Sequence, residues 1–560
     1  MFGGQGEKPK GAKQTPSVKA GAERRQRQMI SVRQKAHGEL MKHVRGDNGS
    51  VSIEELTCLN GDPQDVWTYG AQTAPEMVPR ELLPEFARLV MEGKSEKEVF
   101  HGALLIRKVL SVERNPPHEA VIKSGVVPYL SELMDRFDNP KLQFEAAWAL
   151  TNIAAGTSEN TSALIQFGAI PRFVSLLGSE NEDCRDQGAW AIGNIAGDGV
   201  RCRDLALQYN ALPALLHVLT MPNQPLNALR NAAWAVSNLA RGKPAPPLDS
   251  VSIALPVLSG LLYHPDKEVV IDAAWAISYI SDGSWDRVQA VVDAGVVPRM
   301  VEFLSSPVIP LQTSAIRTVG NIASGNNEQT QTIINCGLLS VIGNLLTHCK
   351  RDIRKEACWT ISNIAAGTLP QIEALIAANV FPLVIKCLEG SDLDIKKEAI
   401  WSVANVVLCG VVSHLRYLLD CNVVPALCEA LLLHETKILT ISLESLMGFL
   451  QLGDDDFRAG ISEENMVAQA IIACGGVNAI ERIQSYTDNN LYSLALSILE
   501  TYFNVEESFP PGGFEASAEF GDAQRNKARN LTFNKRMEGN TNTHTHTHIH
   551  KKRQQQPINK

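Results

Sequence analysis

A tryptophan followed four positions later by an asparagine recurs along this 560-residue chain every 41 to 44 residues. The pairs are Trp148/Asn152, Trp190/Asn194, Trp234/Asn238, Trp359/Asn363 and Trp401/Asn405. Two further positions of the series are altered, with Trp275 before Tyr279 and Arg317 before Asn321. Residues four apart share one face of a helix, so each pair sets an indole beside an amide.

This combination of side chains predicts a surface for an extended basic peptide. An Asn amide offers a donor and an acceptor, and can therefore hold both polar groups of a peptide unit. Neighbouring indoles form slots for the methylene stems of Lys or Arg and attract the cations by about 0.5–2 kcal/mol. Carboxylates near the series could receive the charged ends; they are Asp198, Asp272, Asp282, Glu356 and Glu398.

The alternative interpretation is that the indoles only fill a core. A row of buried Asn amides would then cost about 1–3 kcal/mol for each unmet amide. A separate apolar stripe, with Ala147, Leu150 and Ile153 in one helix, can supply the core instead. We therefore expect the Trp/Asn series to line an open, concave side.

The elements that carry the series are predicted to be helices joined by tight turns. A Gly or Asn followed by apolar residues and Pro recurs at 125–128, 168–171, 210–213, 295–298, 379–382 and 422–425. Gly or Asn ends one helix in the left-handed conformation, and Pro suits the first turn of the next. A period near 42 residues is typical of armadillo and HEAT repeats. The predicted fold is an all-α, right-handed superhelical armadillo solenoid of about ten repeats with disordered tails.

Charge divides the chain into a body and two basic ends. Residues 1–46 hold 11 Lys and Arg against 3 Glu, and residues 521–560 hold 9 against 2 acids. Because the whole chain carries −9, residues 47–520 carry −24. We expect a basic arm at 1–50, a linker at 51–82, the repeat domain at 83–505 and a disordered tail at 506–560. An acidic body favours cationic partners.

Several classes of protein find no support in the sequence. The 11 cysteines are scattered without a C-x-x-C motif, which favours reduced thiols. There is no apolar run long enough for a membrane span and no phosphate-binding loop, nucleophile motif or spaced Cys/His cage. We predict no enzyme activity, no cofactor, no metal site, and no direct contact with nucleic acid or membrane.

Three segments resemble the importin-α (karyopherin-α) family of nuclear-import adaptors. They are Arg107-Lys-Val-Leu-Ser-Val-Glu-Arg-Asn-Pro-Pro117, Leu150-Thr-Asn-Ile-Ala-Ala-Gly-Thr-Ser158 and Trp190-Ala-Ile-Gly-Asn-Ile-Ala-Gly-Asp198. The segments containing Trp275/Tyr279 and Arg317/Asn321 resemble the family's own irregular repeats. The resemblance covers roughly residues 23–510.

The resemblance implies two binding sites for nuclear localisation signals on one groove. The implied major site comprises Trp148, Asn152, Gly156, Thr161, Gln187, Trp190, Asn194, Asp198, Trp234, Asn238 and Asp272. Within it, Asp198 would bind the key lysine ammonium, helped by carbonyls near Gly156 and by Thr161. The implied minor site comprises Arg317, Asn321, Glu356, Trp359, Asn363, Glu398, Trp401 and Asn405.

The N-terminal arm resembles the domain through which the family binds importin-β. The implied contacts are Arg24, Arg25, Arg27, Arg33, Lys35, Lys42 and Arg45. In the family this arm also occupies the groove of its own chain through a Lys-Arg-Arg cluster, where this chain has Lys42-His43-Val44-Arg45. The departure predicts weak autoinhibition.

The predicted function is that of an adaptor that shuttles between cytoplasm and nucleus. Its implied partners are importin-β, cargo with basic signals, and an export receptor for recycling. The rival hypothesis is a catenin-like armadillo scaffold, which would need a basic groove for acidic ligands.

Overall fold

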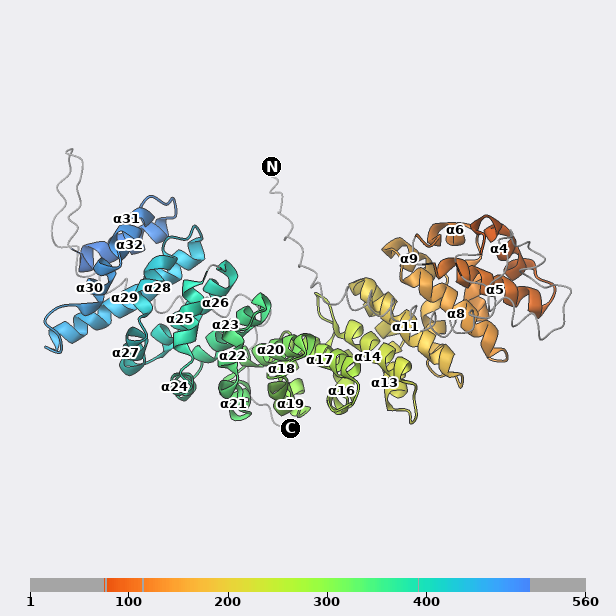
Figure 1. Cartoon of the computed structure of the whole chain (residues 1–560), viewed down its shortest axis with the longest axis horizontal. Helices are drawn as coiled ribbons and strands as arrows, with labels where there is room; N and C mark the ends of the chain where they lie inside the picture. Colours follow the sequence, from red (N-terminus) through yellow and green to blue (C-terminus); the bar gives the residue numbers. More distant parts are fainter. Residues whose placement is uncertain (1–74, 76–77, 113–114, 391, 504–560) are drawn as a thin grey trace, which may run out of the picture. The chain divides into compact units, whose positions relative to one another are not determined.

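The computed structural model describes Pro75 and residues 78–112, 115–390 and 392–503 of the chain (Figure 1). Within these residues the regular structure is entirely helical, in agreement with the predicted all-α class. The seven arm residues predicted to contact importin-β and the tail at 506–560 lie outside the described residues. The described helices run from Arg80 to Tyr502 and fall into two units that divide after Cys421.

The first unit is a stack of helical repeats, each ending in a long helix that we call the third helix. The third helices are α5 (Glu96–Leu110), α8 (Pro140–Ala154), α11 (Glu182–Asp198), α14 (Leu226–Ala240), α17 (Lys267–Ser281), α20 (Ile309–Ala323), α23 (Arg351–Ala365) and α26 (Leu393–Cys409). Within this unit each third helix packs against the one that follows it, from α5 on α8 to α23 on α26 (Figure 1). This is the arrangement of an armadillo solenoid, as the period predicts.

Two shorter helices precede most third helices. The first helices are α6 (His118–Lys123), α9 (Ser158–Gln166), α12 (Val200–Gln208), α15 (Leu248–Val251), α18 (Trp285–Asp293), α21 (Asn327–Asn335), α24 (Leu369–Ala377) and α27 (Val412–Asp420). The second helices are α7 (Val127–Leu133), α10 (Ala169–Leu176), α13 (Ala211–Thr220), α16 (Leu255–Leu261), α19 (Val297–Phe303), α22 (Ile342–Leu346) and α25 (Phe381–Glu389). The 3₁₀ turns η4 (Ser252–Ala254) and η5 (Leu338–Ser340) precede α16 and α22, and η3 (Arg80–Leu82) with α4 (Leu83–Glu92) precedes α5.

The second unit contains five helices: α28 (Val423–Ala430), α29 (Thr436–Arg458), α30 (Met466–Ala473), α31 (Gly476–Ile483) and α32 (Asn489–Tyr502). The long helices α29 and α32 take the place of third helices and pack against each other. Together the two units therefore hold ten third helices among the described residues, the number of repeats that the sequence predicts.

The turns between first and second helices have the predicted conformation. All six marker residues adopt positive φ angles of 51° to 76°; they are Gly125, Gly168, Asn210, Gly295, Asn379 and Asn422. Each following Pro lies within the first three residues of a second helix. The turn chemistry in the sequence is therefore sufficient to locate these helix boundaries.

We call the Trp/Asn series, with its altered members, the ladder. Second and third helices are joined through a buried or half-buried side chain five residues before the Trp or Arg of each ladder pair. A Gln or Arg there donates a hydrogen bond, at 2.6 to 2.8 Å, to a carbonyl one to three residues after the last residue of the second helix. The donor and acceptor residues are Gln143 and Met134, Arg185 and Ser179, Gln312 and Leu304, and Arg354 and His348. These bonds satisfy carbonyls that a helix end leaves without an intrahelical partner.

The core is supplied by the apolar stripe that the sequence assigns to it. Ala147, Leu150 and Ile153 on α8 are fully buried, and so are Ile192 and Ile195 on α11. The ten cysteines that the structure describes are all free thiols, and Cys184, Cys202, Cys358 and Cys428 are buried.

No single described helix is long and apolar enough to cross a membrane. Two bent helix pairs, α24 with α25 and α30 with α31, reach the required length and composition only when each pair is taken together.

A small residue on one third helix makes room for the indole of the next. A methyl group placed on Gly193 of α11 would lie 2.3 Å from the Trp234 ring, and one on Gly320 of α20 would lie 2.6 Å from the Trp359 ring. Such distances are far inside van der Waals contact. The glycines therefore set how closely these indoles approach the preceding repeat.

We predict that Gly193→Ala destabilises the protein by about 1–3 kcal/mol, because the added methyl overpacks the contact with Trp234. The matched control is Gly260→Ala on α16, where the methyl would meet no atom within 4 Å. That control should be neutral or stabilise by up to about 1 kcal/mol, because it reduces the freedom of the unfolded chain. The measurement is the shift of the denaturant midpoint followed by tryptophan fluorescence. A Gly193→Ala protein as stable as the Gly260→Ala protein would contradict the proposed contact.

Candidate functional site

The asparagines of the series tie each third helix to the one before it. Asn238 donates from Nδ2 to the carbonyl of Gly193 at 2.9 Å, and Asn405 to that of Ser362 at 2.8 Å. Asn321 donates to the Ser278 carbonyl at 3.1 Å, and Asn194 to the Thr151 carbonyl at 3.4 Å. In each case the acceptor is the residue before the ladder Asn, or Tyr279, of the preceding repeat. The amide donor is therefore engaged within the chain.

Two polar atoms of the ladder amides have no partner in these contacts. The Oδ1 atom of Asn238 and the Nδ2 atom of Asn363 have no hydrogen-bond partner among the described residues. An unmet buried polar atom costs about 1–3 kcal/mol. Both atoms are covered in the unliganded chain, so a ligand can reach them only if neighbouring side chains shift.

The expectation that the whole series lines an open side is only partly right. Trp148, Trp359, Trp401, Asn194 and Asn363 are half-buried and retain an accessible face or edge. The central indoles are buried, with exposed fractions of 6% for Trp190, 4% for Trp234 and 7% for Trp275. Four ladder amides, at positions 152, 238, 321 and 405, are also buried. Adjacent third helices pack so closely that Trp234 and the buried amides lie against the third helix of the preceding repeat.

Asp198 is the last residue of α11 and lies beside the start of α9, the first helix of the same repeat. The Ser158 hydroxyl donates to its Oδ1 at 2.8 Å, and the Cys202 thiol lies 3.5 Å from its Oδ2. Among the described residues no Lys or Arg forms an ion pair with Asp198. The half-buried carboxylate can therefore receive an external cation. Ser158 was not predicted as a site residue, although it stands in the segment that carries the resemblance.

The remaining residues of the predicted major site are less accessible than a ligand contact requires. Gln187 is fully buried, and neither polar atom of its amide has a partner among the described residues. Thr161 is 1% exposed and donates to the Thr157 carbonyl, while Asp272 is 5% exposed. Gly156, by contrast, is exposed at the turn before α9. Of the predicted major site, Asp198, Gly156 and the edge of the ladder are therefore the accessible part.

Two carboxylates flank the half-buried indoles of the minor site. Glu356 precedes Trp359 by three residues on α23, and Glu398 precedes Trp401 by three on α26. Burial raises the pKa of both carboxyls above their ordinary value of 4.5, against the lowering effect of Arg317 on Glu356 and of Lys355 on Glu398. Neither forms an ion pair among the described residues. Each is therefore a partly desolvated acid whose nearest cations do not pair with it directly.

Asp282, which the sequence also suggests as a cation acceptor, is already paired. Lys243 Nζ lies 2.9 Å from its Oδ1. Nearby, Trp275 and Tyr279 stack with ring centroids 5.6 Å apart. The irregular repeat therefore replaces the amide of the ladder by an aromatic pair.

Arg107 is a site residue that the sequence pattern could have revealed. It stands 41 residues before Trp148, and Ser111 follows it by four, so the two occupy the Trp and Asn places of the first repeat. Asn152 Nδ2 donates to the Ser111 hydroxyl at 3.0 Å, as ladder amides do elsewhere. The Arg107 guanidinium carbon lies 4.3 Å from the Trp148 ring centroid. The ladder therefore begins one repeat earlier than the first Trp.

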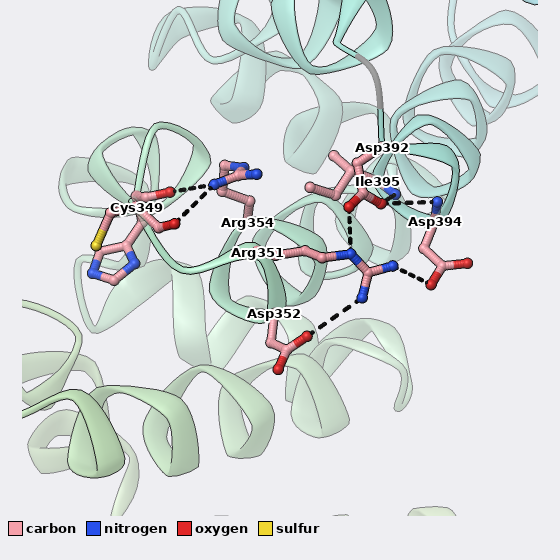
Figure 2. A network of polar contacts seen from close by, with 8 residues as sticks. Cys349, Arg351, Asp352, Arg354, Asp392, Asp394 and Ile395 are labelled. Atoms are coloured by element: carbon pink, nitrogen blue, oxygen red, sulfur yellow. Dashed lines mark hydrogen bonds and ion pairs between the residues drawn. The ribbon is translucent and has the colours of Figure 1, made fainter. Parts of the chain in front are cut away.

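Ion pairs join the first turns of neighbouring third helices. Arg351 of α23 contacts Asp392 and Asp394 at the start of α26, and it lies 3.6 Å from Asp352 (Figure 2). The hydrogen bond from Arg351 lowers the pKa of both carboxyls, Asp392 and Asp394. Arg230 of α14 pairs in the same way with Asp266, which caps α17. These carboxylates are neutralised within the chain, unlike Asp198, Glu356 and Glu398.

No group of His, Cys, Asp or Glu in the described part of the chain is arranged to hold a metal ion. The geometry instead offers isolated carboxylates along a ladder of indoles and amides.

Comparisons with known proteins identify the repeats and the family. The description Armadillo/beta-catenin-like repeat matches residues 115–155, 157–197, 199–241, 286–324, 326–366 and 369–407. An Atypical Arm repeat matches 465–514, and a HEAT-like repeat matches 227–280. The six Armadillo matches follow the helix triplets of the structure.

Among curated relatives, Importin subunit alpha-4 of Arabidopsis thaliana is 42% identical over 488 residues, which is 86% of this chain and 89% of that protein. Importin subunit alpha-2 of the same plant is 50% identical over 72% of this chain and 76% of its own length. Importin subunit alpha-B of Dictyostelium discoideum is 54% identical over 43% of this chain and 47% of its own length.

A solved structure of an engineered protein aligns with 75% of this chain and 98% of its own, at a TM-score of 0.65 and 26% identity. It supports the fold without adding to the function. The armadillo repeats and the extent of the identity show that this chain belongs to the importin-α family of nuclear-import adaptors.

Proposed function

We propose that the ladder face of the first unit binds an extended Lys/Arg-rich localisation signal. We also propose that residues 1–50 link the bound cargo to importin-β. The observation that carries the first proposal is the set of partly buried carboxylates without an ion pair among the described residues, Asp198, Glu356 and Glu398; the latter two stand three residues before the half-buried indoles of Trp359 and Trp401. A carboxylate without a counter-charge at such a place attracts a cation, and an indole face accepts its stem.

The spacing of the ladder suits an extended chain. Packed helices lie about 8–10 Å apart, and an extended peptide advances about 3.3–3.6 Å per residue. Each repeat therefore spans two to three peptide residues. Asn238 and Asn363 carry one unmet acceptor and one unmet donor on this face, which a peptide would reach only after neighbouring side chains shift.

Two groups of acceptors on one face favour signals with two basic clusters. The first group is centred on Asp198 at the end of α11, and the second on Glu356 and Glu398 of α23 and α26. When one cluster is bound, a linker holds the second near its site and raises its effective concentration.

The rival hypothesis, a catenin-like scaffold for acidic ligands, is disfavoured by the same residues. Such a ligand would bring its carboxylates next to Asp198, Glu356 and Glu398, and like charges repel. Binding to an export receptor, and the absence of direct nucleic-acid or membrane contacts, stay predictions.

The first test is Asp198→Lys. We expect it to abolish measurable binding of a labelled Lys-Lys-Lys-Arg-Lys peptide, because a repulsive charge replaces a partly buried acceptor worth a few kcal/mol. The matched control is Asp183→Lys, which makes the same change of net charge at the exposed start of the same helix. Fluorescence anisotropy gives both affinities. A loss of less than about threefold (0.65 kcal/mol) in Asp198→Lys would reject this acceptor.

The second test concerns the acceptors on α23 and α26. Glu398→Arg and Trp401→Ala should weaken a peptide with two basic clusters more than a peptide with one, because only the former needs both groups. The one-cluster peptide is the internal control for folding. Equal losses for both peptides would contradict a division into two sites.

The third test concerns the arm. Deletion of residues 1–50 should abolish importin-β binding in a pull-down and raise cargo affinity by less than about tenfold, or 1.4 kcal/mol. The gain is small because His43 is mostly neutral at pH 7 and Val44 is uncharged, which leaves two cations to compete for the groove. Restoring Arg at both positions should lower the cargo affinity of the full chain only. A hundredfold gain on deletion of the unaltered arm would show strong autoinhibition instead.

A further inference from the structure

The first place of the ladder is occupied by a cation that belongs to the chain itself. Arg107 reaches from α5 to α8, where its Nε and Nη2 atoms donate to the two carboxylate oxygens of Glu145 at 2.6 and 3.1 Å. The guanidinium lies over the Trp148 ring, with its carbon 4.3 Å from the ring centroid. Both charged residues are buried, at 9% and 8% exposure. Arg107 therefore makes the two contacts, with a carboxylate and with an indole face, that we propose for a bound basic peptide.

An Arg, a Glu and a Trp occupy the corresponding positions of α20 and α23, but there the Arg and the Glu do not form an ion pair. Arg317 stands 42 residues before Trp359, and Glu356 precedes that Trp by three, just as Glu145 precedes Trp148. Arg317 is close enough to lower the pKa of Glu356 but forms no ion pair with it among the described residues. A buried pairing is therefore not a necessary result of this spacing. It is specific to the first repeat.

We infer that Arg107 closes the ladder at the first repeat, so that a basic peptide finds no cation subsite between α5 and α8. This inference rests on the proposed function and defines the end of the same site. The indole face and carboxylate that would form the subsite are already satisfied. A peptide Lys could reach them only by displacing a bidentate ion pair, which one flexible ammonium cannot match.

The consequence is a fixed limit on the peptide positions that select for Lys or Arg. Positions that meet Asp198 should select strongly for a cation. The position that meets Arg107 should accept Lys and an uncharged residue of similar length equally. The limit comes from a residue of the protein and not from the length of the groove, because α5 packs on α8 as the other third helices pack on their neighbours.

The experiment measures the affinities of a peptide series for the full chain and its variants. A labelled Lys-Lys-Lys-Arg-Lys core carries alanine flanks, and Lys or norleucine is placed in turn at each flanking position. In the wild type, no flanking position on the side that approaches the first repeat should distinguish Lys from norleucine by more than about twofold. In Arg107→Met, one such position should prefer Lys by about fivefold or more, within the range of a cation on a shielded indole face.

Two variants separate the outcomes. The double variant Arg107→Met/Glu145→Gln also removes the carboxylate that the single variant leaves unpaired. It should therefore lose most of the new preference for Lys. It also avoids the unpaired buried charge that could unfold the single variant. Arg317→Met is the matched control and should create no preference at that position. Circular dichroism reports whether each variant is folded.

The inference is overturned if the wild type already selects Lys at the position where Arg107→Met has its effect. It is equally overturned if a folded Arg107→Met protein gains no preference at any flanking position. If Arg107→Met does not fold, the wild-type peptide series alone tests the inference. Selection for Lys at every flanking position would then show that the cation subsites do not end at the first repeat. Failure of the core peptide to bind the wild type would refute the proposed function itself and is recorded before any variant is compared.

Discussion

The close stacking of third helices is the constraint on which the rest of this structure depends. Each helix approaches its predecessor until an Asn amide can donate to a backbone carbonyl of the earlier repeat, as in the pairs of Asn238 with Gly193 and Asn405 with Ser362. Each such bond contributes only about 0.5–1.5 kcal/mol, but it fixes the register between two helices. Small residues before the ladder Asn are required by the same approach, since the Trp234 ring fills the space where a Gly193 side chain would lie.

The same packing decides the chemistry of the ladder face. Because neighbouring repeats cover much of each indole and carboxylate, the acids of α23 and α26 are held in partly desolvated positions. Burial raises the pKa of Glu356 and of Glu398, which means that their charged forms lack the solvation they would have in water. A cation delivered by a ligand restores that stabilisation. A packing interaction within the solenoid thus prepares the acceptors that a basic peptide would use.

The chain also neutralises selected carboxylates itself. Arg351 pairs with Asp392 at the start of the next third helix (Figure 2), and the half-buried pair of Arg230 with Asp266 joins α14 to the start of α17. The exposed Arg351 adds little stability through its pair, which mainly holds the helix ends together. Arg107 with Glu145 is different, because both groups are buried and an indole covers the guanidinium. The distribution of paired and unpaired acids, and not the total negative charge, therefore determines where a cation can bind.

The sequence by itself determined the repeat, the turns and the core. The period of the Trp/Asn pairs, the left-handed Gly and Asn turns and the stripe of Ala147, Leu150 and Ile153 depend on interactions within one repeat or between neighbouring repeats. Such interactions leave a regular pattern along the chain. The acidic character of the body and the candidate acceptors could be read in the same way.

Only the tertiary structure decided which members of the pattern are accessible. Trp190 and Trp234 match the pattern as well as Trp401 does, yet both are buried, and Trp234 lies against Gly193 of the adjacent third helix. Asp198 and Asp282 are equivalent as isolated carboxylates, yet Lys243 pairs with one and no described cation pairs with the other. Exposure and pairing depend on side chains about 40 residues away whose directions are set by helix packing, and no local pattern in the sequence encodes those directions.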